Sequence, residues 1–170
     1  SEHNFGGQPL PKIGEFKVMQ LAKMAAGLGQ VTPIPEKFSF AHAMTHLAPL
    51  WISGVDSIES REIIWEAAQA SWKKNGMPGW YVDGRMGGTD SHVLTVNLDD
   101  AESRAAYANS LAPGGGFTED PCAMRSTVFA GMGCAAEIVG EVARILQGNG
   151  KSRQRNTEWL SGQRIEGWTA

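Results

Sequence analysis

The stretch Trp51–Arg61, WISGVDSIESR, decides the fold class expected of this chain. An apolar run over residues 49–55 is typical of a buried strand, and the apolar residues that follow recur at helical spacing. Ser57 stands between the two, at a position where a serine side chain favours the start of a helix. The predicted helix runs to about Lys74. A strand that leads directly into a helix predicts one unit of an α/β fold.

The rest of the chain alternates between the same two kinds of element. Further helices are predicted over residues 13–28, 40–47 and 124–147, and further strands over 31–38, 80–82 and 92–98. Residues 151–170 are expected to form a partly extended tail. One stripe of the last helix is apolar, and it carries Val128, Met132, Ala135, Val139, Val142 and Leu146. This alternation predicts a mainly parallel sheet with flanking helices.

Composition excludes several classes of protein. The 170 residues are enough for one domain with its own core. A net charge of −3 gives no basic footprint for nucleic acid. No apolar run reaches the length that would cross a bilayer, so no membrane partner is expected. The two cysteines, Cys122 and Cys134, are too few for a disulfide framework or a four-cysteine zinc site, which favours a cytoplasmic protein with reduced thiols.

Two aspartates follow predicted strands, where ligands bind in open α/β sheets. Asp56 follows the strand over 49–55 and precedes a helix N-terminus, which favours anions. Asp83 follows the strand over 80–82. Asp83 and Arg85 are expected to pair with each other and shape the site. Alternatively, Asp56 only helps to cap the helix, and Asp83 and Arg85 only brace a turn.

Residues 127–136, TVFAGMGCAA, contain the G-x-G-x-x-A pattern of a dinucleotide-binding turn. That turn requires a second strand with an acidic residue about 20 positions further on. No apolar strand follows here, and the helical stripe continues without a break. We therefore expect Gly131 and Gly133 to be close-packing residues inside a helix, with Cys134 in the core.

Three segments, taken in order, resemble one family. They are HNFGGQ (3–8) with IGEFKV (13–18), then VDSIESR (55–61), then YVDGRMGG (81–88) with PCAMRS (121–126). Together they resemble the ThiF/MoeB superfamily, the adenylating domain of ubiquitin-activating enzymes and bacterial sulfur-carrier activators. The resemblance covers most of residues 2–148 and implies a Rossmann-like fold.

The resemblance also implies a reaction and its residues. The family binds ATP and Mg²⁺ and adenylates the C-terminal carboxylate of a ubiquitin-like or sulfur-carrier protein. Lys17 matches the phosphate-binding lysine, and Asp56 matches the aspartate near Mg-ATP, which makes it the expected catalytic and metal-binding residue. Asn4 and Gln8 match the loop over the nucleotide. Cys122 lies near the cysteine on which some members form a thioester, although a structural thiol is the alternative.

The sequence departs from the family pattern in two places. Gly7 stands where the family usually has an arginine that contacts phosphate. The strand, glycine-rich turn, helix and strand that open the family's domain are absent. Residues 1–150 therefore match the C-terminal part of an adenylation domain, followed by a tail over 151–170. We expect the missing strand–helix–strand to come from another chain or a precursor piece, and a dimer is expected as in the family.

Two other functions remain open on the sequence alone. A non-catalytic binding subunit with the same fold would tolerate both departures. A cysteine hydrolase that pairs Cys122 with His92 or His42 is the weaker alternative, because nothing in the spacing brings a histidine to that thiol.

Overall fold

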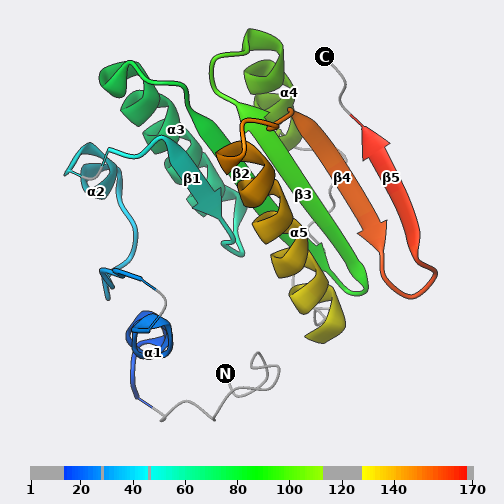
Figure 1. Cartoon of the computed structure of the whole chain (residues 1–170), viewed down its shortest axis with the longest axis horizontal. Helices are drawn as coiled ribbons and strands as arrows, with labels where there is room; N and C mark the ends of the chain where they lie inside the picture. The colour runs from blue at the N-terminus through cyan, green and yellow to red at the C-terminus, as the bar shows by residue number, and fades with distance from the viewer. Residues whose placement is uncertain (1–13, 28, 46, 113–127, 168–170) are drawn as a thin grey trace. The chain divides into compact units, whose positions relative to one another are not determined.

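The computed structural model describes residues 14–27, 29–45, 47–112 and 128–167 (Figure 1). The chain divides into two units, residues 1–38 and 39–170, and each is described by itself. The first unit contains helix α1 (Lys17–Ala25), which buries none of its side chains. Residues 31–38 form no strand, contrary to the prediction. Pro33 and Pro35 explain this, because neither can donate a hydrogen bond to a neighbouring strand.

The second unit is built on a five-stranded sheet in the order β1-β2-β3-β4-β5. Helix α5 packs on one face of β2 and β3, and α3 and α4 lie on the other face (Figure 1). The predicted α/β class is confirmed. The strands are β1 (Leu50–Ser53), β2 (Trp80–Gly87), β3 (Asp90–Asn97), β4 (Arg153–Glu158) and β5 (Gln163–Gly167). The helices of this unit are α2 (Phe40–Thr45), α3 (Ile58–Asn75), α4 (Ala101–Leu111) and α5 (Val128–Leu146).

The sheet is mixed, so the prediction of a mainly parallel sheet is wrong for the described strands. Only β1 and β2 run parallel, and the other neighbouring pairs run antiparallel. The cause is the link between β2 and β3, which consists of Gly88 and Thr89 alone. A parallel connection needs a crossover of about a dozen residues. Gly88 has a φ of 58°, which suits a tight hairpin turn.

Two segments have more structure than the sequence predicted. The strand expected over 80–82 continues to Gly87, so Asp83 lies inside β2 and not beyond its end. Residues 153–167, expected in a tail, form β4 and β5 of the same sheet. Helix α4 was not predicted, and the Asp100 side chain caps its N-terminus by accepting hydrogen bonds from the amides of Glu102 and Ser103.

Helix α5 turns its predicted apolar stripe away from the sheet. Val139 and Leu146 of that stripe are 66% and 76% exposed. The opposite side of the helix buries Cys134, which packs with Val82 and Val93 in the core between helix and sheet. Because α5 is apolar on both sides, its periodicity predicts a helix but does not choose the buried side.

Gly131 and Gly133 lie inside α5, as predicted, and Gly133 is a point of close packing. A Cβ atom on Gly133 would lie 2.3 Å from the ring of Trp159. That ring is fixed by its Nε1, which donates a 2.9 Å hydrogen bond to Ser91 Oγ. A Cβ on Gly131 would lie 3.7 Å from Met86 Sδ, an ordinary contact distance.

We therefore predict that Gly133→Ala and Gly131→Ala change stability in opposite directions. Gly133→Ala should destabilise the fold by about 1–3 kcal/mol through overpacking. Gly131→Ala should stabilise it by up to about 1 kcal/mol, because alanine favours a helix more than glycine does. Thermal unfolding of the two variants tests the difference, and stabilisation by both would show that Trp159 does not press on the helix.

Candidate functional site

The residues singled out by the resemblance are described only in part. Asn4, Gln8 and Cys122 lie outside the described residues. Lys17 is exposed at the start of α1, in the first unit, and Asp56 is exposed in the second unit. The hydrolase alternative also depends on Cys122, so no geometry of that pairing is described.

Asp56 lies in the short link between β1 and α3, just beyond the carboxyl end of β1. Its carboxylate is exposed and makes no hydrogen bond or ion pair with any residue that the structure describes. The helix cap comes from Ser57, whose Oγ accepts a 3.2 Å hydrogen bond from the amide of Ser60. The alternative that Asp56 serves as the side-chain cap of α3 is therefore wrong.

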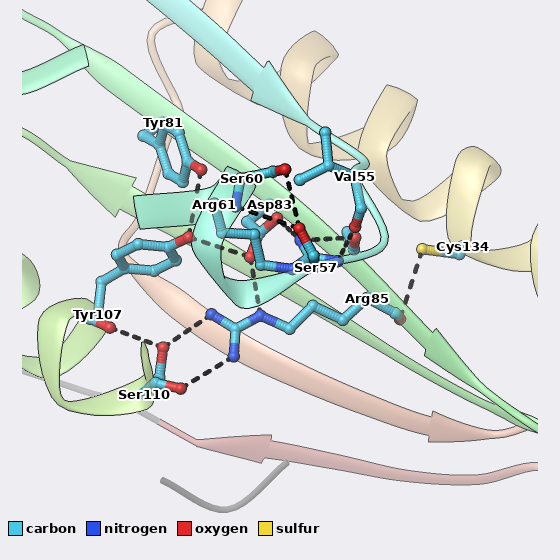
Figure 2. A network of polar contacts seen from close by, with 11 residues as sticks. Val55, Ser57, Ser60, Arg61, Tyr81, Asp83, Arg85, Tyr107, Ser110 and Cys134 are labelled. Atoms are coloured by element: carbon cyan, nitrogen blue, oxygen red, sulfur yellow. Dashed lines mark hydrogen bonds and ion pairs between the residues drawn. The ribbon is translucent and has the colours of Figure 1, made fainter. Parts of the chain in front are cut away.

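Arg61 ties the link that carries Asp56 to the sheet. Its side chain extends from the first turn of α3 and is almost fully buried. One terminal nitrogen, Nη2, donates to the backbone carbonyl of Val55, the residue before Asp56 (Figure 2). The other, Nη1, donates to Asp83 Oδ1 and, at 3.2 Å, to the carbonyl of Gly84.

Asp83 is the centre of this buried polar network. It is fully buried inside β2, and its second oxygen, Oδ2, accepts from Arg85 Nε at 2.8 Å and from the Tyr107 hydroxyl at 3.1 Å (Figure 2). Arg85 then reaches the end of α4, where Nη1 and Nη2 donate to the carbonyl and Oγ of Ser110. The predicted Asp83–Arg85 pair is confirmed, but it lies within a strand and not in a turn.

Aromatic rings cover the network on the face of the sheet that carries α3 and α4. Trp65 packs against Tyr81 and Tyr107, with ring centroids 5.2 and 4.5 Å away. Burial and the nearby Asp83 carboxylate raise the pKa of both tyrosines well above the ordinary value. Both hydroxyls therefore stay protonated at neutral pH, and the Tyr107 hydroxyl is within hydrogen-bond distance of both Asp83 Oδ2, at 3.1 Å, and the Tyr81 hydroxyl, at 3.2 Å.

Two other titratable groups lie near the network. His92 of β3 lies opposite Arg85 of β2 in the sheet register. Burial, and to a smaller extent the charge of Arg85, lowers the pKa of His92 to about 4. Cys134 is buried on the other face of β2, where burial and then Glu137 raise the pKa of its thiol to about 12. The burial of Cys134 in the core cluster confirms the prediction of a core cysteine, and a thiol with a raised pKa is a poor nucleophile.

Arg61 and Tyr107 were not among the predicted site residues. Arg61 stands five residues after Asp56 within the VDSIESR segment, and this closeness in the sequence was the available signal. Tyr107 lies on a helix that the sequence did not predict, so nothing pointed to it.

Searches for a metal site, for a membrane-spanning helix and for related proteins add little information on the function. Within the described ranges, no three or more His, Cys, Asp and Glu side chains are grouped so that they could hold a metal ion. None of the described helices has the length and apolar character needed to cross a membrane. No protein-family model matches the sequence, and a search of curated proteins returns no significant match.

Proposed function

We propose that this chain takes part in the ATP-dependent adenylation of the C-terminal carboxylate of a ubiquitin-like or sulfur-carrier protein. The observation that carries the proposal is Asp56, an exposed carboxylate without a partner among the described residues, held beyond the carboxyl end of β1. Ligands of open α/β sheets bind at such strand ends. The resemblance of residues 55–61 to the family segment supports the same role.

Asp56 fits a shared Mg²⁺ site better than a complete one. Mg²⁺ in nucleotide sites is usually held by one or two carboxylates together with phosphate oxygens and water. Asp56 is exposed and belongs to no group of three or more His, Cys, Asp and Glu side chains within the described residues, which matches that arrangement. When bound, Mg²⁺ would neutralise charge that develops on the phosphates.

The remaining parts of the proposal come from the resemblance. Lys17 would bind phosphate, and Asn4 and Gln8 would lie over the nucleotide. The glycine-rich nucleotide turn would be supplied by a partner piece or subunit, and a dimer would form. Cys122 would accept the acyl group as a thioester in a second step, with AMP as the leaving group.

The test is the exchange of ATP with pyrophosphate in the complex reconstituted with its carrier protein. Asp56→Ala should reduce the exchange rate by about 10²-fold or more, the effect of removing one group that stabilises transition-state charge. Glu59→Ala is the matched control, because Glu59 is exposed in the first turn of α3 and carries the same charge. It should leave the rate unchanged.

Two results would contradict the proposal. Full exchange by Asp56→Ala would remove Asp56 from the reaction. A wild-type complex that binds the carrier protein but does not exchange pyrophosphate would point to the non-catalytic binding subunit.

A further inference from the structure

The link that carries Asp56 has little intrinsic rigidity. It consists of residues 54–57, and Gly54 is exposed with no atom within 4 Å of where a Cβ would stand. Short exposed links with few contacts open locally at low free-energy cost. If a carboxylate must contact a phosphate-bound cation, displacing it by about 1 Å lowers the rate of the reaction. Something other than the link itself must therefore hold Asp56.

Arg61 is the side chain suited to that task. Its planar fork divides between two elements, because Nη2 donates to Val55 O in the link and Nη1 donates to Asp83 in β2. Both hydrogen bonds are charge-assisted, which makes them strong, and the one to Asp83 is buried while the one to Val55 is partly buried. A lysine has the same charge but presents one ammonium group, so it cannot reproduce the fork.

Arg85 provides a comparison within the same network. It binds the same carboxylate through Oδ2 and is buried to the same degree, at 2% exposed against 4% for Arg61. Its other contacts go to Ser110 on α4 and not to the link. The two arginines therefore share a partner and an environment but differ in which segment they hold.

We propose that Arg61, anchored by Asp83, is a positioning residue that fixes the 54–57 link and so aims Asp56 at the phosphate-bound cation. This inference rests on the proposed function for its effect on rate, but the fixing of the link can be measured without any activity.

The experiment compares Arg61→Lys with Arg85→Lys in the intact protein. Backbone order parameters from NMR relaxation should be about 0.85 at residues 55–57 in the wild type and fall below about 0.6 in Arg61→Lys. Arg85→Lys should leave them unchanged, although it removes comparable contacts. In the exchange assay, Arg61→Lys should lower kcat by about 10²-fold with a smaller change in KM for ATP. Arg85→Lys should retain the wild-type kcat.

The outcomes separate the two proposals. Order parameters below about 0.6 at residues 55–57 in the wild type would overturn the inference, whether or not the variants fold. An ordered link and full kcat in Arg61→Lys would overturn it while the adenylation proposal stands. A link loosened only in Arg61→Lys, together with a wild type inactive in exchange, would support Arg61 as the anchor and reject adenylation.

Discussion

Asp83→Asn is expected to lower the free energy of unfolding by about 3–5 kcal/mol, as when one partner of a buried ion pair is removed. The Asp83 carboxylate is fully buried and is the acceptor for Arg61 and Arg85, which are themselves buried. Asparagine keeps the shape but removes the charge, so two guanidinium groups would remain without an anion. It would also turn amide hydrogens toward groups that can only donate. A loss of this size is a large share of the stability of an ordinary domain.

Urea denaturation measures this loss through the midpoint, provided that the slope stays the same. Asp90→Asn is the control, since Asp90 lies half-buried at the far end of the same hairpin and makes no ion pair with the described residues. Its effect should stay within about 0.5 kcal/mol. A similarly small effect for Asp83→Asn would mean that water reaches the two arginines and that the network contributes little to stability.

The parts of the fold that the sequence predicted depend on local signals. The WISGVDSIESR stretch predicts β1 and α3 because an apolar run, a serine cap and a helical stripe follow one another directly. The prediction that Gly131 and Gly133 lie inside a helix succeeded for a similar reason, since a stripe that continues through both glycines is incompatible with a turn, although only Gly133 is closely packed. In each case, the residues that decide the structure are neighbours in the sequence.

The parts that were missed depend on partners far along the chain. β2 contains Asp83 and Arg85 at inward positions, and a buried charge is tolerated in a strand only when another element neutralises it. Here that element includes Arg61, which stands 22 residues before Asp83. The predicted strand therefore ended at Val82, because the sequence pattern alone gives no reason to bury the charged residue that follows.

β4 was missed for the same physical reason. Its inward residues are Arg155 and Thr157, which look like solvent-facing residues in the sequence. They are buried because Glu137 and Glu141 of α5 lie over them. Thr157 Oγ1 donates a hydrogen bond to Glu137 at 2.9 Å, and Arg155 Nη1 donates one to Glu141 at 3.1 Å. The candidate site shows the same limit, since the spacing indicated Asp56 but not the arginine that holds the link.

Glu141→Gln is the second substitution with a large expected effect on stability. Glu141 is buried under α5, and its two oxygens accept hydrogen bonds from Arg144 and from Arg153 and Arg155 of β4. Removing its charge leaves three guanidinium groups that repel one another. Glu166 of β5 still pairs with Arg155 at 2.9 Å, but it replaces only part of the lost negative charge. We expect a loss of about 3–5 kcal/mol, since the site is buried and joins the helix to the sheet.

The loss should also depend on pH. Burial would raise the pKa of Glu141, but hydrogen bonds from Arg144 and Arg153 outweigh it and lower that pKa below the usual 4.5. The folded state therefore holds this proton less tightly than the unfolded state, so the contribution is complete above pH 4.5 and disappears as the pH falls through the lower folded value. Urea denaturation from about pH 7 to pH 3 should show the wild type and Glu141→Gln converging in acid. Exposed Glu66→Gln on α3 should parallel the wild type throughout, and a Glu141→Gln deficit that stays constant across this range would show that packing, and not the carboxylate charge, joins α5 to β4.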